Sequence, residues 1–495
     1  MATTAALKRH ATSVDAARAP LVVDLDGTLT PTDTLVESVV VVIKASPFNL
    51  LRLPLWLLKG RSGFKEAVAT RATIDAARLP YCEPLLEYLR GEKAKGRPII
   101  LATAAHRSIA EAVSTHLGLF DEVLATEAGR NLKGKTKLES ITQHCGSEFI
   151  YVGDSNVDVP IWQAAQGAVL VGVAANTAAL VRSTVPVEKE FAKEDRGLRV
   201  WLRALRLHQW VKNLLLFVPL LTAFSFVEIG KLATMMVAFV AFSLAASATY
   251  IVNDLHDLDA DRAHPRKRLR PFAGARLPII HGVLAAAACM AVALVLAWAV
   301  SGRFLAMLLA YVALTTAYSW ILKQQVLVDV LMLSLLYTLR ILAGSVAVGI
   351  VTSTWLLAFS VFIFLSLALV KRCAELVSLG RSGGEATRGR DYRVSDLVVL
   401  WPLGVGAALS AAVVFGLFIN APETQARYAT PQLLWLVAVG LIYWLARLWI
   451  KTSRGEMHDD PVIYALKDRG SRVTVLVMIA TMLVAHFVSL YHLAS

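Results

Sequence analysis

The chain has 495 residues, of which 56% are hydrophobic and 18% charged, with a mean hydropathy of +0.57. Soluble proteins carry about 25% charged residues, so this composition excludes a purely soluble protein, a disordered chain and a collagen. Cys82, Cys145, Cys289 and Cys373 lie far apart without a C-x-x-C pair, which argues against both a zinc site and a disulfide framework. The net charge of +13 fits either nucleic acid or a membrane surface, and its distribution along the chain decides between them.

Polar and apolar residues are separated along the chain. Residues 1–200 carry charges throughout and predict a mixed α/β segment, whereas long apolar stretches follow Trp201. Because the first twenty residues contain no apolar core of a signal peptide, we expect the N-terminal part to stay in the cytoplasm. The predicted domains are a tail at 1–19, an α/β domain at 20–185 with a helical cap at about 33–97, a partly amphipathic linker at 186–208 and a membrane domain at 209–495.

Nine apolar stretches have about the 20 residues that a helix needs to cross a bilayer. They lie at about 210–228, 232–252, 278–300, 303–322, 326–349, 354–372, 395–419, 431–450 and 472–491. With the N-terminus inside, the inner loops hold 18 lysines and arginines and the outer loops hold 3, which follows the positive-inside rule. We therefore predict a multi-pass protein of the inner (cytoplasmic) membrane, and the positive charge needs no nucleic acid to explain it.

Two carboxylates follow the first apolar strand of the α/β part. The sequence PLVVDLDGTLT places Asp24 and Asp26 directly after Leu21–Val23, and Gly27 then allows a tight turn. Side chains two positions apart on a strand point the same way, so both carboxylates can reach one site.

Four motifs in chain order resemble those of the haloacid dehalogenase superfamily of phosphohydrolases, whose first motif is D-x-D-G-T. The later motifs contribute Thr103 (PIILATAAH), Lys137 (NLKGKTKL), and Asp154 and Asp158 (FIYVGDSNVDV). The resemblance implies a Rossmann-like α/β phosphatase domain over roughly residues 18–185. It implies that Asp24 forms a phospho-aspartyl intermediate and that Asp26 is the general acid and base. By the same resemblance, Thr103 and Lys137 hold phosphate oxygens.

The resemblance also implies a magnesium site in this domain. Its ligands would be Asp24, the backbone carbonyl of Asp26, and Asp154, with Asp158 in support. Lys135 competes with Lys137 for the lysine role because only two positions separate them, although the spacing G-x-x-K favours Lys137.

The segment between the first two motifs predicts a mostly helical cap. Within it, Phe48–Leu58 (FNLLRLPLWLL) is short for a membrane span but rich in leucine and tryptophan. It is either a face of the cap that dips into the bilayer surface or a buried cap helix, and the sequence leaves both interpretations open.

The strongest motif of the membrane part follows the second predicted span, in YIVNDLHDLDADRAHPRKRLRP. Asn253, Asp257 and Asp261 are four positions apart, and Asp254 lies within one turn of Asp257. On a helix these residues share one face, where carboxylates repel one another unless a cation such as hydrated Mg²⁺ is present. The basic residues that follow suit a diphosphate, and they include Arg262, Arg266 and Lys267.

This N-D-x-x-D-x-x-x-D motif resembles the first aspartate motif of the UbiA superfamily of intramembrane prenyltransferases, which implies an all-α bundle of nine transmembrane helices and a second Mg²⁺ site. No second D-x-x-x-D follows between the sixth and seventh spans, where the loop is basic and glycine-rich. Together with QWVKN and KRCAEL, the motif makes residues 200–491 similar to the branch that transfers phosphoribose onto polyprenyl phosphate, the decaprenyl-phosphate phosphoribosyltransferase type.

That branch implies two phosphorylated substrates. The donor, phosphoribosyl pyrophosphate, carries the diphosphate that needs the metal, whereas the acceptor phosphate can be bound by basic side chains alone. The further candidate substrate-binding residues are Gln209, Lys212, Lys323, Asp329, Arg340, Lys371 and Arg372. Arg340 is notable because it lies within a predicted span, where an unpaired charge is costly.

The two parts predict a bifunctional enzyme that makes a phosphoribosylated polyprenyl lipid and then removes its 5-phosphate. One alternative is a UbiA-type prenyltransferase that uses a prenyl diphosphate and an aromatic acceptor, with an accessory phosphatase domain. Another is a transporter or lipid-binding protein with a regulatory phosphatase domain. The sequence leaves homo-oligomerisation open.

Overall fold

The computed structural model describes residues 19–127, 131–192, 197–387, 390–457 and 460–489. The predicted N-terminal tail at 1–19 therefore lies outside the described residues, apart from its last position. The chain divides into two compact units. One combines Met1–Leu205 with Tyr250–Ala286, and the other combines Arg206–Thr249 with Ala287–Ser495.

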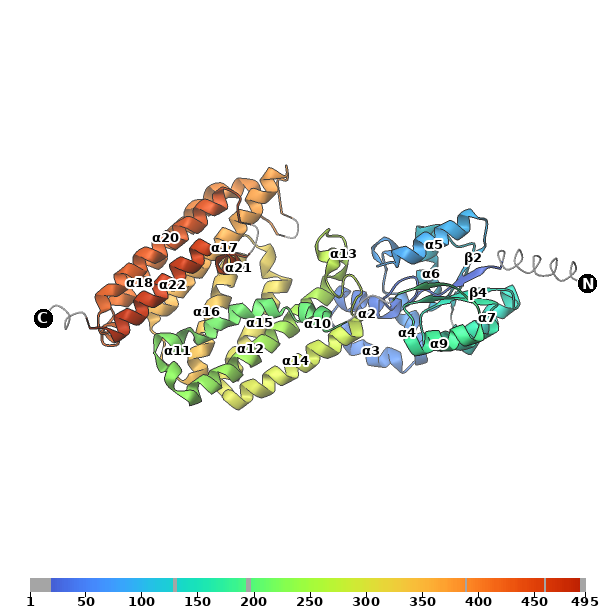
Figure 1. Ribbon diagram of the computed structural model, residues 1–495, viewed down its shortest axis with the longest axis horizontal. Coiled ribbons are helices and arrows are strands. Elements are labelled where there is room, and N and C mark those ends of the chain that lie inside the picture. The colour runs from blue at the N-terminus through green and yellow to red at the C-terminus, as the bar shows by residue number, and fades with distance from the viewer. Residues whose placement is uncertain (1–18, 128–130, 193–196, 388–389, 458–459, 490–495) are drawn as a thin grey trace, which may run out of the picture. The chain divides into compact units, whose positions relative to one another are not determined.

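The first unit contains a six-stranded parallel sheet of order β3-β2-β1-β4-β5-β6 (Figure 1). Its strands are β1 (Leu21–Val23), β2 (Ile99–His106), β3 (Glu122–Thr126), β4 (Ile150–Gly153), β5 (Gly167–Val171) and β6 (Val187–Phe191). The chain runs outward from β1 to β3 and returns on the other side of β1 at β4. Ligands bind such sheets at the carboxyl ends of the strands beside this switch point.

Helices cover both faces of the sheet because successive strand residues point to opposite sides. Leu21 and Val23 of β1 pack with α5 and α6, whereas Val22 packs with α7, α8 and α9. These helices are α5 (Glu83–Ala94), α6 (Arg107–Leu117), α7 (Lys135–Cys145), α8 (Val159–Ala164) and α9 (Ala175–Thr184), with η2 (Asn156–Asp158) before α8. The predicted α/β fold is confirmed.

The cap inserted after β1 has a small apolar core of its own. It consists of α2 (Thr34–Ala45), α3 (Asn49–Leu57) and α4 (Gly60–Ala69), followed by η1 (Ala76–Arg78). Its buried core residues are Val42, Trp56, Val68 and Ala72. The cap is smaller than the predicted 33–97, because Leu85, Leu86 and Leu89 anchor α5 on the sheet.

Strand β6 lies in the range that the sequence predicted as linker. Its sequence VEKEF exposes the three charged residues at an edge of the sheet, and such charged edges prevent pairing with other chains. A charged five-residue edge strand carries little of the apolar pattern that predicts strands. The remainder of the predicted linker includes α10 (Leu198–Ala204).

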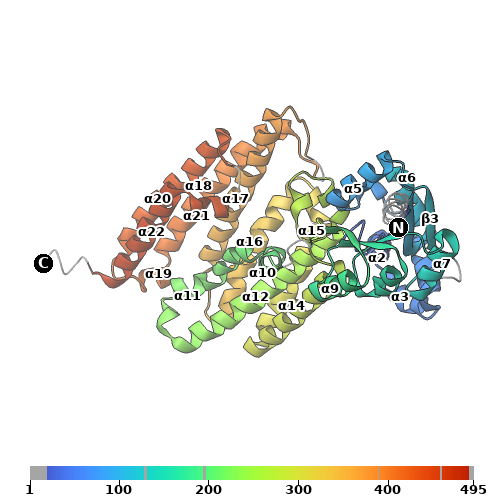
Figure 2. The same ribbon diagram turned by 45° about the vertical axis from the view of Figure 1, so that its right-hand side comes forward.

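Eight helices of the described residues are long and apolar enough to cross a membrane. The long α-helices are α12 (Ile229–His256), α14 (Ile279–Val300), α15 (Gly302–Trp320), α16 (Val328–Val348), α17 (Thr354–Arg381), α18 (Leu397–Asn420), α20 (Leu434–Ser453) and α22 (Arg469–Phe487). The shorter helices are α13 (Leu258–Arg262), α19 (Pro422–Gln425), α21 (Pro461–Lys467), η5 (Lys267–Leu269), η6 (Leu322–Gln324), η7 (Val394–Asp396) and η8 (Pro431–Leu433). In the second unit α18, α20 and α22 lie side by side (Figures 1 and 2). The protein is therefore a multi-pass membrane protein.

The predicted first span at 210–228 is not among these eight, so the predicted nine spanning helices are corrected to eight for the described residues. It forms η3 (Leu207–Phe217), α11 (Val218–Thr222) and η4 (Ser225–Val227) instead. Pro219, in the first turn of α11, has no amide hydrogen to continue a helix from η3. Phe224 then adopts a left-handed φ of +54°, which ends the next helix.

Candidate active sites

The first candidate site lies where the neighbouring strands β1 and β4 end. Asp24 directly follows β1 and Asp154 directly follows β4. Between the two, Gly27 has a φ of +82°, and a Cβ there would lie 2.4 Å from Oδ2 of Asp154. The turn that carries the first motif past the Asp154 carboxylate thus requires glycine, for conformation and for space.

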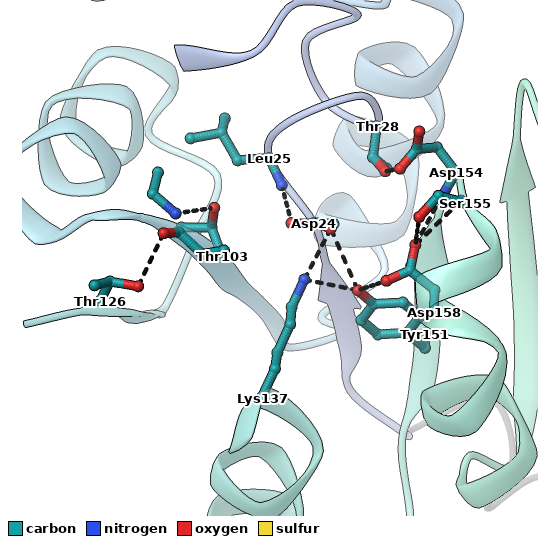
Figure 3. A network of polar contacts seen from close by, with 12 residues as sticks. Asp24, Leu25, Thr28, Thr103, Thr126, Lys137, Tyr151, Asp154, Ser155 and Asp158 are labelled. Atoms are coloured by element: carbon teal, nitrogen blue, oxygen red, sulfur yellow. Dashed lines mark hydrogen bonds and ion pairs between the residues drawn. The ribbon is translucent and has the colours of Figure 1, made fainter. Parts of the chain in front are cut away.

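Lys137 and Tyr151 connect the acidic side chains of this site (Figure 3). Lys137 Nζ lies 2.8 Å from Asp24 Oδ2 and donates to the Tyr151 hydroxyl at 2.7 Å. That hydroxyl donates to Asp158 Oδ1 at 3.0 Å and lies 3.5 Å from Asp24 Oδ2. Lys135 is exposed, so Lys137 is the lysine of the motif that reaches Asp24.

The carboxylate oxygens of Asp24, Asp154 and Asp158 lie within 4.8 Å of one another. In the described part of the chain this is the one group of three or more Asp, Glu, His or Cys residues close enough to hold a metal ion. Burial raises the pKa of Asp154 to about 7, and Asp158 and Asp24 add to this shift. Carboxylates in this arrangement suit a divalent cation. Asp158 Oδ2, however, accepts hydrogen bonds from the Asp154 and Ser155 amides and the Ser155 hydroxyl. Asp24 and Asp154 are therefore the better ligand candidates, and Asp158 orients the loop.

Asp26 is held by the start of the cap. Its Oδ1 accepts the amide hydrogen of Thr34, at the start of α2, at 2.8 Å. Burial raises the pKa of Asp26 to about 7, and Asp33 adds to this shift. A carboxyl group that stays protonated near neutral pH is suited to general acid catalysis.

A cavity of about 240 Å³ opens on these groups. Its lining includes Asp24, Asp26, Lys65, Ala104, Ala105, Lys137 and Asp154. Thr103 is fully buried, and its hydroxyl accepts the Ala105 amide hydrogen at 3.0 Å. Thr103 (Figure 3) thus supports the loop at Ala104 and Ala105, which line the cavity, and its predicted contact with phosphate stays a prediction.

Two residues of this site were missed by the sequence reasoning. Tyr151 sits inside an apolar strand, where tyrosine is a common core residue. Lys65 comes from α4 of the cap, and its Nζ donates to the Ala104 carbonyl at 2.6 Å and to Asn131 Oδ1 at 2.7 Å. Tyr151 lies within the quoted stretch FIYVGDSNVDV, where it continues the apolar strand before Asp154, and Lys65 lies in no motif.

The aspartate motif of the membrane part keeps its helical spacing. The Asp257 amide donates to the Asn253 carbonyl at 2.9 Å, and the Asp261 amide donates to the Asp257 carbonyl at 2.8 Å. The three residues therefore follow one another by single turns across the junction of α12 and α13. Because a turn rises 5.4 Å, their side chains are spread along the helix, and within the described residues they do not form a cluster as tight as that of the first site.

Two carboxylates of this motif share one cation within the first unit. Asp254 and Asp261 are buried, and both accept from Arg270 Nη1, at 3.1 and 2.6 Å. Lys267 Nζ also lies 3.9 Å from Asp261. Arg270 belongs to the basic run that follows the aspartate motif.

Arg262 is occupied by protein partners. Its guanidinium forms two hydrogen bonds with Glu37 of α2, at 2.6 and 3.1 Å, and its Nε donates to the Ala273 carbonyl at 3.1 Å. Both side chains are at most 7% exposed. The structure therefore gives Arg262 an internal role rather than the predicted one in substrate binding, and leaves Arg266 and Lys267 as exposed basic candidates.

In the second unit the structure brings Lys212 and Lys371 together around Asp460. Their Nζ atoms lie 2.8 and 3.7 Å from Asp460 Oδ2. These three residues line a small cavity of about 40 Å³ with Tyr337. Gln209 lies in η3, the same short helix that carries Lys212.

Arg340 and Arg372 have internal partners. Arg340 donates to Asn213, the Leu336 carbonyl and the Tyr311 hydroxyl, at 2.6–3.0 Å. Because these hydrogen bonds satisfy the guanidinium, they offset the free-energy cost of placing a charge within a membrane span.

Arg372 is fully buried and pairs with Asp329, which also accepts from the Tyr392 hydroxyl. Asp329 therefore holds Arg372 within the protein, and the predicted roles of both residues in substrate binding stay predictions. Lys323 lies in the short η6, half-buried.

The fold and the first site define a membrane protein that carries a phosphohydrolase-type domain. The family of haloacid dehalogenase-like hydrolases matches residues 21–163, and the UbiA prenyltransferase family matches residues 215–464. The chain belongs to the UbiA prenyltransferase family and carries a haloacid dehalogenase-like domain at its N-terminal side. Both predicted families are confirmed.

Relatives extend over one or both parts. An uncharacterized protein, y4nM, of Sinorhizobium fredii is 40% identical over 91% of this chain and 88% of its own. The decaprenyl-phosphate phosphoribosyltransferase of Mycolicibacterium smegmatis is 32% identical over 57% of this chain and 90% of its own. A UbiA homolog from Archaeoglobus fulgidus, solved with GPP and Mg²⁺, is 19% identical with a TM-score of 0.42, covering 58% of this chain and 100% of that one. The first relative shows that both parts occur together in another protein.

Proposed function

We propose that the chain is a bifunctional enzyme of the cytoplasmic membrane. Its UbiA part transfers 5-phosphoribose from phosphoribosyl pyrophosphate to polyprenyl phosphate, and its phosphatase part removes the 5-phosphate to give polyprenyl-phosphoryl ribose. One observation carries this proposal: a single chain joins a stretch 32% identical to a decaprenyl-phosphate phosphoribosyltransferase to an Asp24–Lys137 ion pair beside Asp154. The first reaction yields a phosphomonoester, which is the class of substrate that the second site is built to cleave.

In the transfer step a phosphate oxygen of the acceptor attacks C1 of the ribose, and the bond from C1 to the diphosphate breaks. Asn253, Asp257 and Asp261 would hold Mg²⁺, which neutralises the departing diphosphate. A phosphate monoester can be bound by lysine and arginine. Lys212 and Lys371 are the preferred candidates, because they line a cavity together.

In the phosphatase step Asp24 attacks phosphorus, and Asp26 gives its proton to the ribose 5-oxygen as the P–O bond breaks. Asp26 then takes a proton from the water that releases phosphate from Asp24. Lys137 balances the charge of Asp24, and Asp24 with Asp154 would hold Mg²⁺, which neutralises phosphoryl charge. The raised pKa of Asp26 supports its assignment as the acid.

The proposal is tested with the full chain in lipid nanodiscs that contain polyprenyl phosphate, supplied with labelled phosphoribosyl pyrophosphate and Mg²⁺. We expect the wild type to release phosphate and form the ribosyl lipid, and Asp24→Asn to accumulate the 5-phosphorylated lipid. Glu139→Gln, which changes an exposed acid on α7, serves as the control and should behave as wild type.

Each half of the proposal can fail separately. If Asp24→Asn makes the same final product as the wild type, the phosphatase assignment is wrong. If no label enters the lipid and the enzyme instead joins a prenyl diphosphate to an aromatic acceptor, the transferase assignment is wrong and the alternative function holds.

A further inference from the structure

Helix α3 of the cap buries one side and exposes the rest. Trp56 lies in the apolar core of the cap, and Leu53 packs against that core from the same side of the helix. These two residues are three positions apart and share one face. Asn49 donates to the Val42 carbonyl at 2.9 Å, and the remaining side chains of the segment 48–58 are exposed on the outward side of the helix.

That outward side is almost entirely apolar, and we call it the apolar cap face. It consists of six side chains that are 56–84% exposed: Phe48, Leu50, Leu51, Leu55, Leu57 and Leu58. At roughly 25 cal/mol for each Å² of apolar surface left in water, a cluster of this size is costly to expose. Contiguous exposed apolar patches mark a protein or membrane contact.

The charge around this face selects the membrane. From Ser38 to Arg61 the chain contains no aspartate or glutamate and four basic residues, Lys44, Arg52, Lys59 and Arg61, of which Lys44 pairs with Asp259 at 3.8 Å. Arg52 and Lys59 are exposed within and directly after α3. Leucine and phenylalanine flanked by basic residues are typical of helices that lie in the interface of anionic bilayers.

The covalent structure ties the unit that carries this face to membrane-spanning helices. Strand β6 ends at Phe191 and the second unit, which contains transmembrane helices, begins at Arg206. Fifteen residues span at most about 50 Å. Because this segment tethers the first unit to membrane helices, the effective concentration of lipid at the apolar cap face is high.

We propose that the apolar cap face inserts into the headgroup region of the membrane and holds the phosphatase cap at the bilayer surface. The cap also lines the phosphatase cavity, through Ser38 of α2 and Lys65 of α4. A cap seated in lipid presents that cavity to phosphate esters carried by lipids in preference to soluble ones. This second consequence rests on the proposed phosphatase function, whereas insertion itself does not.

Insertion is tested by depth measurement on the full chain in nanodiscs of phosphatidylglycerol and phosphatidylethanolamine. Cys82, Cys145 and Cys289 are replaced by serine, the buried Cys373 is retained, and an environment-sensitive NBD group is attached at Leu51→Cys, Leu58→Cys or Leu180→Cys. Leu180 is a matched control, because it is a leucine of the same unit, 46% exposed, on α9.

We expect blue-shifted emission at positions 51 and 58, quenched by lipids that carry a nitroxide, and water-like emission at position 180. Equal emission at all three positions overturns the proposal. A shift at 51 and 58 that lipid-borne nitroxide does not quench also overturns it, because the face is then covered by protein.

The consequence for substrates is tested with a charged variant. Leu51→Asp/Leu58→Asp should lower the hydrolysis of the 5-phosphorylated lipid isolated from Asp24→Asn by about tenfold, which is about 1.4 kcal/mol, and leave p-nitrophenyl phosphate hydrolysis unchanged. Leu180→Asp should change neither rate. Equal losses on both substrates contradict preferential access for lipids. If the wild type hydrolyses neither substrate, the proposed phosphatase function fails, while the depth measurement still decides insertion.

Discussion

Removing the hydroxyl of Tyr151 should disable the phosphatase without removing any of the predicted catalytic residues Asp24, Asp26, Thr103 and Lys137. This hydroxyl accepts from Lys137 Nζ at 2.7 Å and donates to Asp158 Oδ1 at 3.0 Å, and the ring is fully buried. Tyr151→Phe keeps the ring and the strand but leaves both charged groups one partner short.

The size of the effect follows from those two hydrogen bonds. A buried hydrogen bond to a charged group contributes about 1.5–3 kcal/mol, and each 1.4 kcal/mol corresponds to about tenfold in rate. We therefore expect kcat/KM for p-nitrophenyl phosphate to fall by about 10–100-fold. Transfer of phosphoribose to the lipid should continue, so the 5-phosphorylated lipid should accumulate.

Tyr88→Phe is the matched control. Tyr88 also donates its hydroxyl to a carboxylate, Glu188 at 3.2 Å, but from α5 and away from the cavity. The phosphatase rate of Tyr88→Phe should stay within about twofold of the wild type, because Tyr88 lies away from the cavity and an exposed hydrogen bond contributes only about 1 kcal/mol to stability. A Tyr151→Phe variant with wild-type phosphatase kinetics would refute the role given to the hydroxyl network.

Three further outcomes are expected. Gly27→Ala should lower the phosphatase rate by at least about 100-fold, because the added Cβ collides with the Asp154 carboxylate and displaces the turn. Gly118→Ala is the control: Gly118 also has a positive φ, but an added Cβ would meet no atom within 4 Å, so the phosphatase rate should hardly change. Arg97→Met should destabilise the first unit by about 3–5 kcal/mol, seen as a lower first melting transition, because this buried guanidinium joins two glutamates and a backbone carbonyl. The hydrogen bond from Lys93 lowers the pKa of Asp121, so its stabilisation is present above the ordinary pKa of 3.8 and is lost as the pH falls below it. Asp121→Asn should therefore flatten the acid side of the curve of melting temperature against pH.

Motifs tied to strand ends could be predicted because local sequence fixes both the strand and the residue that follows it. Asp24 and Asp154 each follow an apolar run, and parallel strands bring their carboxyl ends to one edge. Tyr151 and Lys65 could not be predicted in the same way. Their roles depend on contacts with residues far away in the sequence, such as Lys137 for Tyr151, which the local pattern around each residue does not indicate.

The membrane part shows the same division. Eight spans follow from length and apolarity alone, whereas the segment 210–228 has a similar composition but is interrupted at Pro219 and Phe224. Hydropathy averages over a window and does not register a single backbone break. Nor could it show that Arg262 pairs with Glu37, more than two hundred residues earlier.

Mass spectrometry of the lipid extracted after a single incubation tests most directly whether one chain performs two consecutive reactions. With both substrates and Mg²⁺, the account predicts that the wild type yields ribosyl lipid, that Asp24→Asn yields the same lipid heavier by one phosphate, and that Asp257→Asn yields neither. Detection of the heavier lipid as the end product of the wild type, or of ribosyl lipid from Asp24→Asn, would contradict it.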